Sequence, residues 1–186
     1  MKYNIIKGSL QQIALSTNQP LAKVLLKVDC VIIIDVSSSM DEKDPKTGET
    51  YYTTACKELE TLQGQLAGRI ALIAFNDTPI FCPQGTPPKP KGLTDLAKAL
   101  EFAKTFDVTG VRFILLSDGE PNSKEQALAI ARTYKNRIDV IFVGTKGSTG
   151  ESFLQSLAFV KNGQSMTADT FVGLYPTIHR MLAVSA

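Results

Sequence analysis

Short apolar runs recur along this chain, separated by longer stretches in which apolar residues lie three or four positions apart. Runs of about four to eight Val, Ile, Leu and Phe residues are typical of strands buried on both faces of a parallel sheet. The pattern predicts strands at residues 27–34, 69–75, 111–116 and 138–143, with weaker candidates at 79–82 and 164–167.

The stretches between these runs have the periodicity of amphipathic helices. In one of them, Ser123-Lys-Glu-Gln126 has the pattern of a capping box. Five apolar faces are formed by Ala55, Leu59, Leu62 and Leu66; by Leu93, Leu96, Ala97, Leu100 and Ala103; by Ala127, Ala131 and Tyr134; by Phe153, Leu154, Leu157 and Ala158; and by Phe171, Leu174, Ile178 and Leu182. Gly68 ends the first helix, and Pro176 must begin or kink the last.

Alternation of strands and helices predicts βαβ units with right-handed crossovers and a mostly parallel sheet. A doubly wound sheet would have the strand order 3-2-1-4-5-6. The chain shows no internal repeat and no second domain, so residues 21–186 are expected to form a single domain. Residues 1–20 precede the first predicted strand as an N-terminal arm. Its role stays open between a docking helix, an added edge element and a loose arm.

Composition narrows the class of partner. Hydrophobic residues make up 44% of the 186 residues, the net charge is only +2, and there is no long basic block. This gives little reason to expect nucleic acid or an anionic membrane as a partner. No apolar run approaches the roughly 20 residues of a membrane span, and the start of the chain lacks the apolar core of a secretory signal. Three widely spaced cysteines suggest neither a disulfide framework nor a zinc site, so we expect a cytoplasmic location.

Three loops carry residues that could act together. Asp35, Ser37 and Ser39 follow the first strand, Thr94 opens a predicted helix, and Asp118 follows the strand at 111–116. In the order 3-2-1-4-5-6 these two strands are neighbours, and their helices leave to opposite faces. The two aspartates then flank the topological switch point, where open α/β sheets bind ligands, and Thr94 lies on a connection that can reach it.

Two carboxylates and three hydroxyls form an all-oxygen donor set, which favours Mg²⁺, Mn²⁺ or Ca²⁺ over zinc or copper. The two carboxylates balance a divalent charge, so the site can accept one more anionic oxygen from outside. Each residue alone has an ordinary structural explanation: an aspartate after a strand is usually a turn residue, and Thr94 would serve as a helix N-cap. Their combination at one edge of the sheet favours the metal site.

The sequence Asp35-x-Ser37-x-Ser39, the Gly-x-Thr94 helix start and the Ser-Asp118-Gly loop resemble the metal-ion-dependent adhesion site of von Willebrand factor A domains. The resemblance implies a Rossmann-like three-layer α/β fold, here with one short antiparallel edge strand, and a bound Mg²⁺. It implies that Ser37 and Ser39 bind the metal directly, and that Thr94 binds it directly or through water, depending on the state of the domain. It also implies that Asp35 and Asp118 balance the charge of the metal, partly through water. Ser38 stands where the family usually has glycine, and it should point away from the metal.

The function we expect is that of a stand-alone adaptor or scaffold that captures an Asp or Glu carboxylate of a partner protein at the metal. The residues expected to form the partner-binding rim are Met40, Asp41, Glu42, Gly119 and Glu120. The resemblance implies a bacterial type of adaptor, with an AAA+ ATPase or a stress-operon protein as partner.

Two alternatives remain: a metal-assisted hydrolase, in which the metal activates water, and a module that assembles through residues 1–20 without metal. We do not expect an enzyme, because the chain has no Gly-x-Ser-x-Gly nucleophile elbow and only one histidine, His179. The glycine-rich stretch at 144–150 matches no phosphate-binding pattern and is expected to be a flexible connection.

Overall fold

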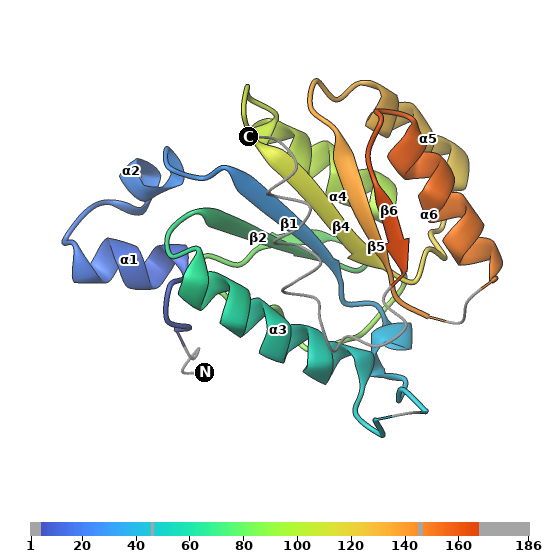
Figure 1. The fold of residues 1–186 in the computed structure, drawn as a ribbon, viewed down its shortest axis with the longest axis horizontal. Coiled ribbons are helices and arrows are strands. Elements are labelled where there is room, and N and C mark those ends of the chain that lie inside the picture. The colour runs from blue at the N-terminus through green and yellow to red at the C-terminus, as the bar shows by residue number, and fades with distance from the viewer. Residues whose placement is uncertain (1–4, 46, 145–146, 168–186) are drawn as a thin grey trace.

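A mostly parallel sheet forms the centre of the molecule, in a computed structural model that describes residues 5–45, 47–144 and 147–167. The described strands have the order β3-β2-β1-β4-β5-β6. They are β1 (Cys30–Asp35), β2 (Ile70–Phe75), β3 (Pro79–Phe81), β4 (Arg112–Ser117), β5 (Ile138–Phe142) and β6 (Ser165–Thr167). Only β3 runs antiparallel to its neighbour in this part of the chain (Figure 1). The predicted fold class, strand order and antiparallel edge strand are confirmed.

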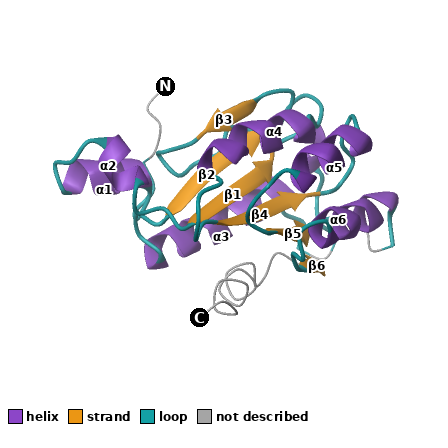
Figure 2. Cartoon of the chain, turned by 90° about the horizontal axis from the view of Figure 1, so that it is seen from above, coloured by secondary structure: helices purple, strands orange, loops and turns teal. Residues whose placement is uncertain are grey.

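Helices cover both faces of this sheet and make three layers (Figures 1 and 2). The α-helices of the described residues are α1 (Leu10–Ser16), α2 (Leu21–Leu25), α3 (Tyr51–Gln65), α4 (Leu96–Ala103), α5 (Lys124–Arg132) and α6 (Thr149–Phe159), with 3-10 helices η1 (Ser38–Asp41) and η2 (Lys104–Phe106). Helix α3 packs on one face of the sheet, and α4, α5 and α6 pack on the other. Ser123 caps α5, as the capping-box pattern predicts.

The burial of β1 on both faces accounts for the absence of alternating polar residues in the predicted strands. Its six residues are all fully buried. Val31 and Ile33 face the core shared with α4, α5 and α6, whereas Ile32 and Ile34 face α3. Because successive side chains of a strand point to opposite faces, a strand covered by helices on both sides must be apolar throughout. The same burial holds Asp35, the last residue of β1, inside the protein.

The segment before β1 contacts the body of the fold. Leu10 and Ala14 of α1 belong to the core that contains α4, α5 and α6, and Ser9 caps α1. The backbone of Gln11 also donates to the carbonyl of Pro83, beside the edge strand β3. The predicted helix at residues 171–182 lies outside the described part of the chain.

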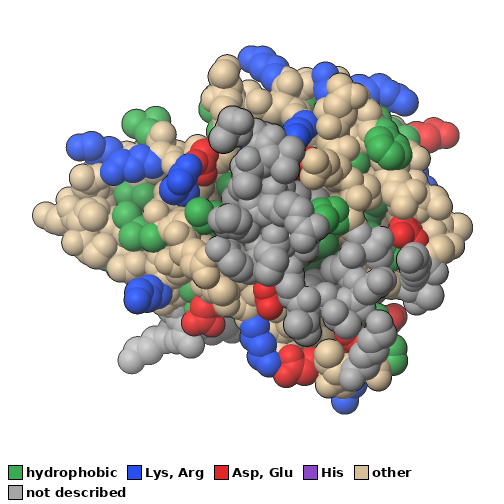
Figure 3. Space-filling view, in the orientation of Figure 1, with side chains coloured by type: hydrophobic (Ala, Val, Ile, Leu, Met, Phe, Trp, Pro, Cys, Tyr) green, Lys and Arg blue, Asp and Glu red, His purple; other side chains and the backbone are tan. Residues whose placement is uncertain are grey.

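Two surface observations bear on partners. Within the described residues, no helix is both long enough and apolar enough to cross a membrane. On the face seen in Figure 3, Lys and Arg side chains are spread over the surface and interspersed with acidic ones.

Candidate metal centre

Neighbouring strands β1 and β4 place the loops that carry Asp35 and Asp118 side by side at one edge of the sheet. The strands are parallel, with Ile34 opposite Leu116, so their carboxyl ends coincide. Asp35 is the last residue of β1, and Asp118 follows the last residue of β4. The chain then continues to α3 on one face and to α5 on the other. The two aspartates therefore flank the switch point of the sheet, where ligands of open α/β folds bind.

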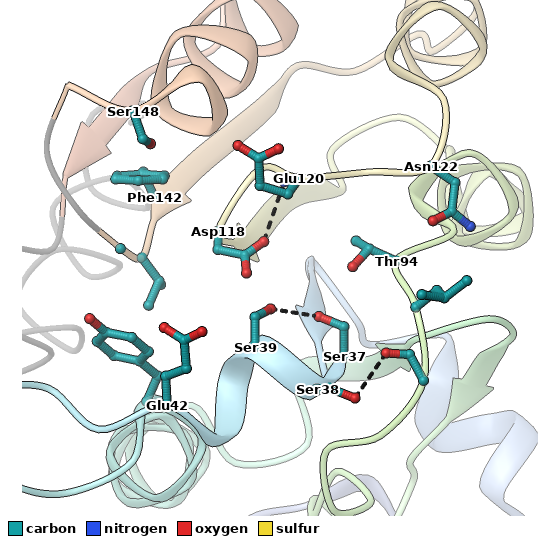
Figure 4. Close-up of a pocket in the computed structure, with 15 residues that line it drawn as sticks. Ser37, Ser38, Ser39, Glu42, Thr94, Asp118, Glu120, Asn122, Phe142 and Ser148 are labelled. Atoms are coloured by element: carbon teal, nitrogen blue, oxygen red, sulfur yellow. Dashed lines mark hydrogen bonds between the residues drawn. The ribbon is translucent and has the colours of Figure 1, made fainter.

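The turn after β1 brings two serine hydroxyls together. Ser37 is extended, and the 3-10 helix η1 begins at Ser38. The Oγ atoms of Ser37 and Ser39 lie 3.1 Å apart, whereas Ser38 points away from them and donates to the carbonyl of Gly92 at 3.1 Å (Figure 4). The sequence-based reason for this orientation, alternation along an extended segment, needs correction. A tight turn, and not a strand, sets the directions of the three side chains.

Backbone hydrogen bonds attach the Thr94 loop to this turn. Lys91 donates to the carbonyl of Val36 at 2.9 Å, and the backbone N–H of Ser38 donates to Gly92 at 3.2 Å. On the other side, Asn122 donates to the carbonyl of Thr94 at 2.9 Å. The loop is thus tied to the connections that follow both β1 and β4. These bonds fix the position of Thr94 between the two loops that carry the other candidate ligands.

Thr94 does not open the helix, which corrects the sequence prediction. Helix α4 begins at Leu96, and its N-cap is Asp95, whose carboxylate accepts from the N–H of Lys98 at 3.1 Å. Thr94 is only 6% exposed, and its hydroxyl makes no side-chain hydrogen bond within the described residues. In Figure 4 this hydroxyl points toward Ser37, Ser39 and Asp118. A hydroxyl that faces an open cavity and has no protein partner is able to bind a ligand there.

These side chains surround one open cavity of about 430 Å³. Its lining consists of Ser37, Ser38, Ser39, Glu42, Tyr51, Gly92, Leu93, Thr94, Asp118, Glu120, Asn122, Phe142, Val143, Gly144 and Ser148. Four of the five predicted metal ligands, all except Asp35, therefore face the same space (Figure 4). The lining holds three carboxylates and no Lys, Arg or His among the described residues, so the charge of the cavity is negative.

Asp35 lies beneath the cavity and is fully buried. Its carboxylate accepts from the backbone N–H of Ser37 at 2.8 Å and from the hydroxyl of Ser117 at 2.7 Å. The pKa of Asp35 is raised from 3.8 to about 6, mainly by burial; the hydrogen bonds from Ser37 and Ser117 oppose the rise, and the charge of Asp118 adds to it. Asp35 thus holds the turn and adds negative charge from below. The sequence analysis did not assign a role to Ser117, although a buried serine at the end of an apolar strand, next to Asp118, is a signal for one.

Only part of the predicted partner-binding rim lies on the surface of the cavity. Glu42 and Glu120 are exposed and line it, whereas Asp41 is exposed but does not line it. Met40 has to be corrected, because its side chain is fully buried in the core beneath α3. Gly119 is also buried and has φ +76°. The 3-10 turn directs Met40 inward, which strict alternation does not foresee.

The start of α6 packs directly against the Asp118 loop. A Cβ atom on Gly150 would lie 2.1 Å from the carbonyl oxygen of Asp118, and one on Gly119 would lie 2.3 Å from that of Gly150. The hydroxyl of Thr149 also donates to the carboxylate of Glu120 at 2.8 Å. Sequence reasoning treated residues 144–150 as a flexible connection only. Gly150 instead is required for close backbone contact with the loop that carries Asp118.

Gly150→Ala should therefore destabilise the protein by about 1–3 kcal/mol, because the new methyl group forces the Asp118 loop and α6 apart. Gly64→Ala is a matched control: a Cβ at this position of α3 meets no atom within 4 Å. Removing a glycine from a helix should stabilise the control by up to about 1 kcal/mol. Urea unfolding of both variants measures the difference. Equal stability of the two variants would show that the contact at Gly150 is not tight.

The donor set fits a hard cation. Within the described residues, no group of three or more His, Cys, Asp or Glu side chains is arranged to hold a metal, so a site here depends on hydroxyl oxygens. Ser37, Ser39 and Thr94 supply these, and Asp118 supplies a carboxylate at the same cavity. Oxygen donors with a low count of charges suit Mg²⁺, Mn²⁺ or Ca²⁺.

Comparison with known proteins identifies the fold. No protein-family model matches the chain, and no curated protein sequence matches it. The structure is similar to a von Willebrand factor type A protein from Catenulispora acidiphila, with 19% identity, a TM-score of 0.63, and coverage of 84% of this chain and 42% of that one. It is also similar to proximal thread matrix protein 1 from the mussel byssus, with 21% identity, a TM-score of 0.57, and coverage of 94% and 51%.

The chain thus spans about half, or less, of the length of these two solved structures. At such identities the likeness shows the fold alone. In its described residues the protein has a von Willebrand factor A-like fold, a six-stranded mixed sheet flanked by helices.

Proposed function

We propose that this protein is a metal-dependent protein-binding module, in which a divalent cation, Mg²⁺ first, is held at the carboxyl edge of the sheet. Ser37, Ser39, Thr94 and Asp118 would hold the ion. The observation that carries the proposal is the convergence of these four side chains on one cavity. Thr94 is 6% exposed as a residue, and its hydroxyl has no side-chain hydrogen-bond partner among the described residues. When bound, the ion supplies a positive centre for an anionic oxygen.

Asp35 supports this arrangement without facing the cavity. By accepting from the N–H of Ser37 and from the hydroxyl of Ser117, it fixes the turn after β1 and the end of β4. Its negative charge and that of Asp118 together balance a divalent ion. The three hydroxyls add donors without adding charge, which leaves the ion able to attract one more carboxylate.

An Asp or Glu side chain of a partner protein is the ligand that suits such a centre. A carboxylate that binds a metal and also accepts hydrogen bonds in a partly enclosed cavity forms a strong and directional contact. The cavity of about 430 Å³ has room for the side chain and for the waters that Mg²⁺ usually retains. We propose an adaptor role on this basis, in place of hydrolysis of a substrate.

Capture from a cell lysate tests the proposal. Native protein in Mg²⁺ should retain partners that are released by EDTA and are absent from Ser37→Ala/Ser39→Ala, because two donors are lost. Ser38→Ala is the matched control, since the Ser38 hydroxyl already bonds to Gly92 and points away from the centre. We expect this control to retain the partners.

Other outcomes decide between the alternatives. Identical partners under all conditions would contradict metal bridging. Self-association that ignores EDTA and is lost when residues 1–20 are removed would favour the assembly module. Metal-dependent turnover of a generic phosphoester that is lost in Asp118→Ala would favour the hydrolase.

A further inference from the structure

The cavity is larger than a metal ion and one carboxylate require. Its volume is about 430 Å³, whereas a water molecule occupies about 30 Å³ in the liquid. Beyond the four candidate ligands, the wall toward β5 and η1 contains Glu42, Glu120, Tyr51 and Phe142. Figure 4 shows Glu42 and Glu120 on different sides of the open space that adjoins Asp118. The part of the cavity next to the candidate centre is therefore walled by two carboxylates and two aromatic rings.

These carboxylates leave the cavity negative even when a metal is bound. Asp35, Asp118, Glu42 and Glu120 carry four negative charges, and a divalent ion balances two of them. None of the described lining residues is a Lys or Arg. A partner carboxylate that approaches the ion thus meets uncompensated negative charge, and like charges about 4 Å apart repel by roughly 1 kcal/mol even at the dielectric constant of water.

Neither rim carboxylate is neutralised within the described residues. Glu42 and Glu120 are exposed and form no ion pair with a described Lys or Arg. Glu120 accepts from the Thr149 hydroxyl, which orients its carboxylate but leaves its charge in place. Tyr51 and Glu42 line the same cavity, and the pKa of the Tyr51 phenol is raised by burial first, then by the charge of Asp44, then by that of Glu42. Two carboxylates and an aromatic ring are the groups that attract a Lys or Arg side chain.

We propose that the captured segment carries a Lys or Arg within about three residues of the metal-binding Asp or Glu, and that this cation lies between Glu42 and Glu120 against Tyr51. This inference rests on the proposed metal-dependent binding and adds the charge pattern of the partner. The protein then selects acidic residues with a basic neighbour over purely acidic segments, because the basic neighbour offsets the repulsion from the rim.

Selection from a random decapeptide display library tests the charge pattern. Native protein in Mg²⁺ should enrich peptides that contain an Asp or Glu with a Lys or Arg nearby. Glu42→Gln/Glu120→Gln should still enrich acidic peptides but without the basic neighbour. Glu60→Gln/Glu101→Gln is the matched control, since these two glutamates are exposed on α3 and α4 and lie outside the cavity. We expect the control to enrich the same peptides as native protein.

An affinity cycle on one enriched peptide measures the size of the effect. Replacing its basic residue by Gln should weaken binding to native protein by about two- to fivefold, the range of exposed ion pairs, and should not weaken binding to Glu42→Gln/Glu120→Gln. Metal-dependent enrichment of acidic peptides with no basic bias would overturn this inference alone. Enrichment that EDTA does not change, or no enrichment at all, would overturn the proposed function and this inference together. Two metal ions per native chain, and one per chain of the double variant, would assign the rim to a second cation and overturn it as well.

Discussion

Asp118→Asn is expected to abolish the stabilisation of the protein by Mg²⁺. Asp118 is the carboxylate that lines the cavity beside the three hydroxyls, and its amide isostere keeps the shape of the loop but removes the charge. At 100 times the dissociation constant, a ligand that binds only the folded state adds about 2.7 kcal/mol of stability. For a domain of this size that corresponds to a rise in melting temperature of roughly 5–10 °C. Thermal unfolding across a Mg²⁺ titration measures it.

Asp41→Asn is the matched control for this experiment. Asp41 ends η1 and is exposed, so its replacement removes one nearby negative charge without touching the lining of the cavity. The control should keep most of the Mg²⁺-dependent rise, reduced only by weaker long-range attraction. If both variants respond to Mg²⁺ as native protein does, the ion does not bind at Asp118. If neither variant nor native protein responds at any concentration, the site does not take Mg²⁺.

The fold could be predicted from the sequence because its strands are buried on both faces. All of β1 and nearly all of β4 are buried. Strands buried on both faces require short continuous runs of Val, Ile and Leu, and such runs can be recognised in a sequence. Boundaries were less certain: the strand predicted at 27–34 begins at Cys30 and extends to Asp35. A strand ends where its hydrogen bonding ends, and residue type alone does not determine that point.

The candidate site could be predicted only as a set of residues, not as a geometry. The motif placed Asp35 and Asp118 at adjacent strand ends, which follows from the strand order. The inward direction of Met40 follows from the turn at η1, and the unbonded hydroxyl of Thr94 follows from Asp95 serving as the helix cap. A local sequence pattern also does not predict contacts between segments that are far apart in the chain. The packing of Gly150 against Asp118 joins residues 32 positions apart.

Asp35→Asn should stabilise the metal-free protein at neutral pH, although it removes a residue of the motif. Burial raises the pKa of Asp35 from 3.8 to about 6, so ionising this carboxyl group costs the metal-free fold roughly 3 kcal/mol. Asparagine is isosteric: its carbonyl can accept from the N–H of Ser37, and its amide can donate to the Ser117 hydroxyl. We expect a gain of about 1–3 kcal/mol in EDTA at pH 7, measured by urea unfolding.

The stability of the metal-free protein should depend on pH through the ionisation of Asp35. The pKa of Asp35 is higher in the folded state than in the unfolded state, so the metal-free fold binds more protons between pH 4 and 6. Native protein should therefore lose this contribution to stability as the pH rises from about 4 through 6, and Asp35→Asn should not. Saturating Mg²⁺ at pH 7 should reverse the order, because the ion compensates the buried charge in native protein and binds poorly to the variant. A variant that is less stable than native protein in both EDTA and Mg²⁺ would contradict the prediction. It would show that Asp35 stabilises the turn through its hydrogen bonds and that its negative charge does not destabilise the metal-free fold.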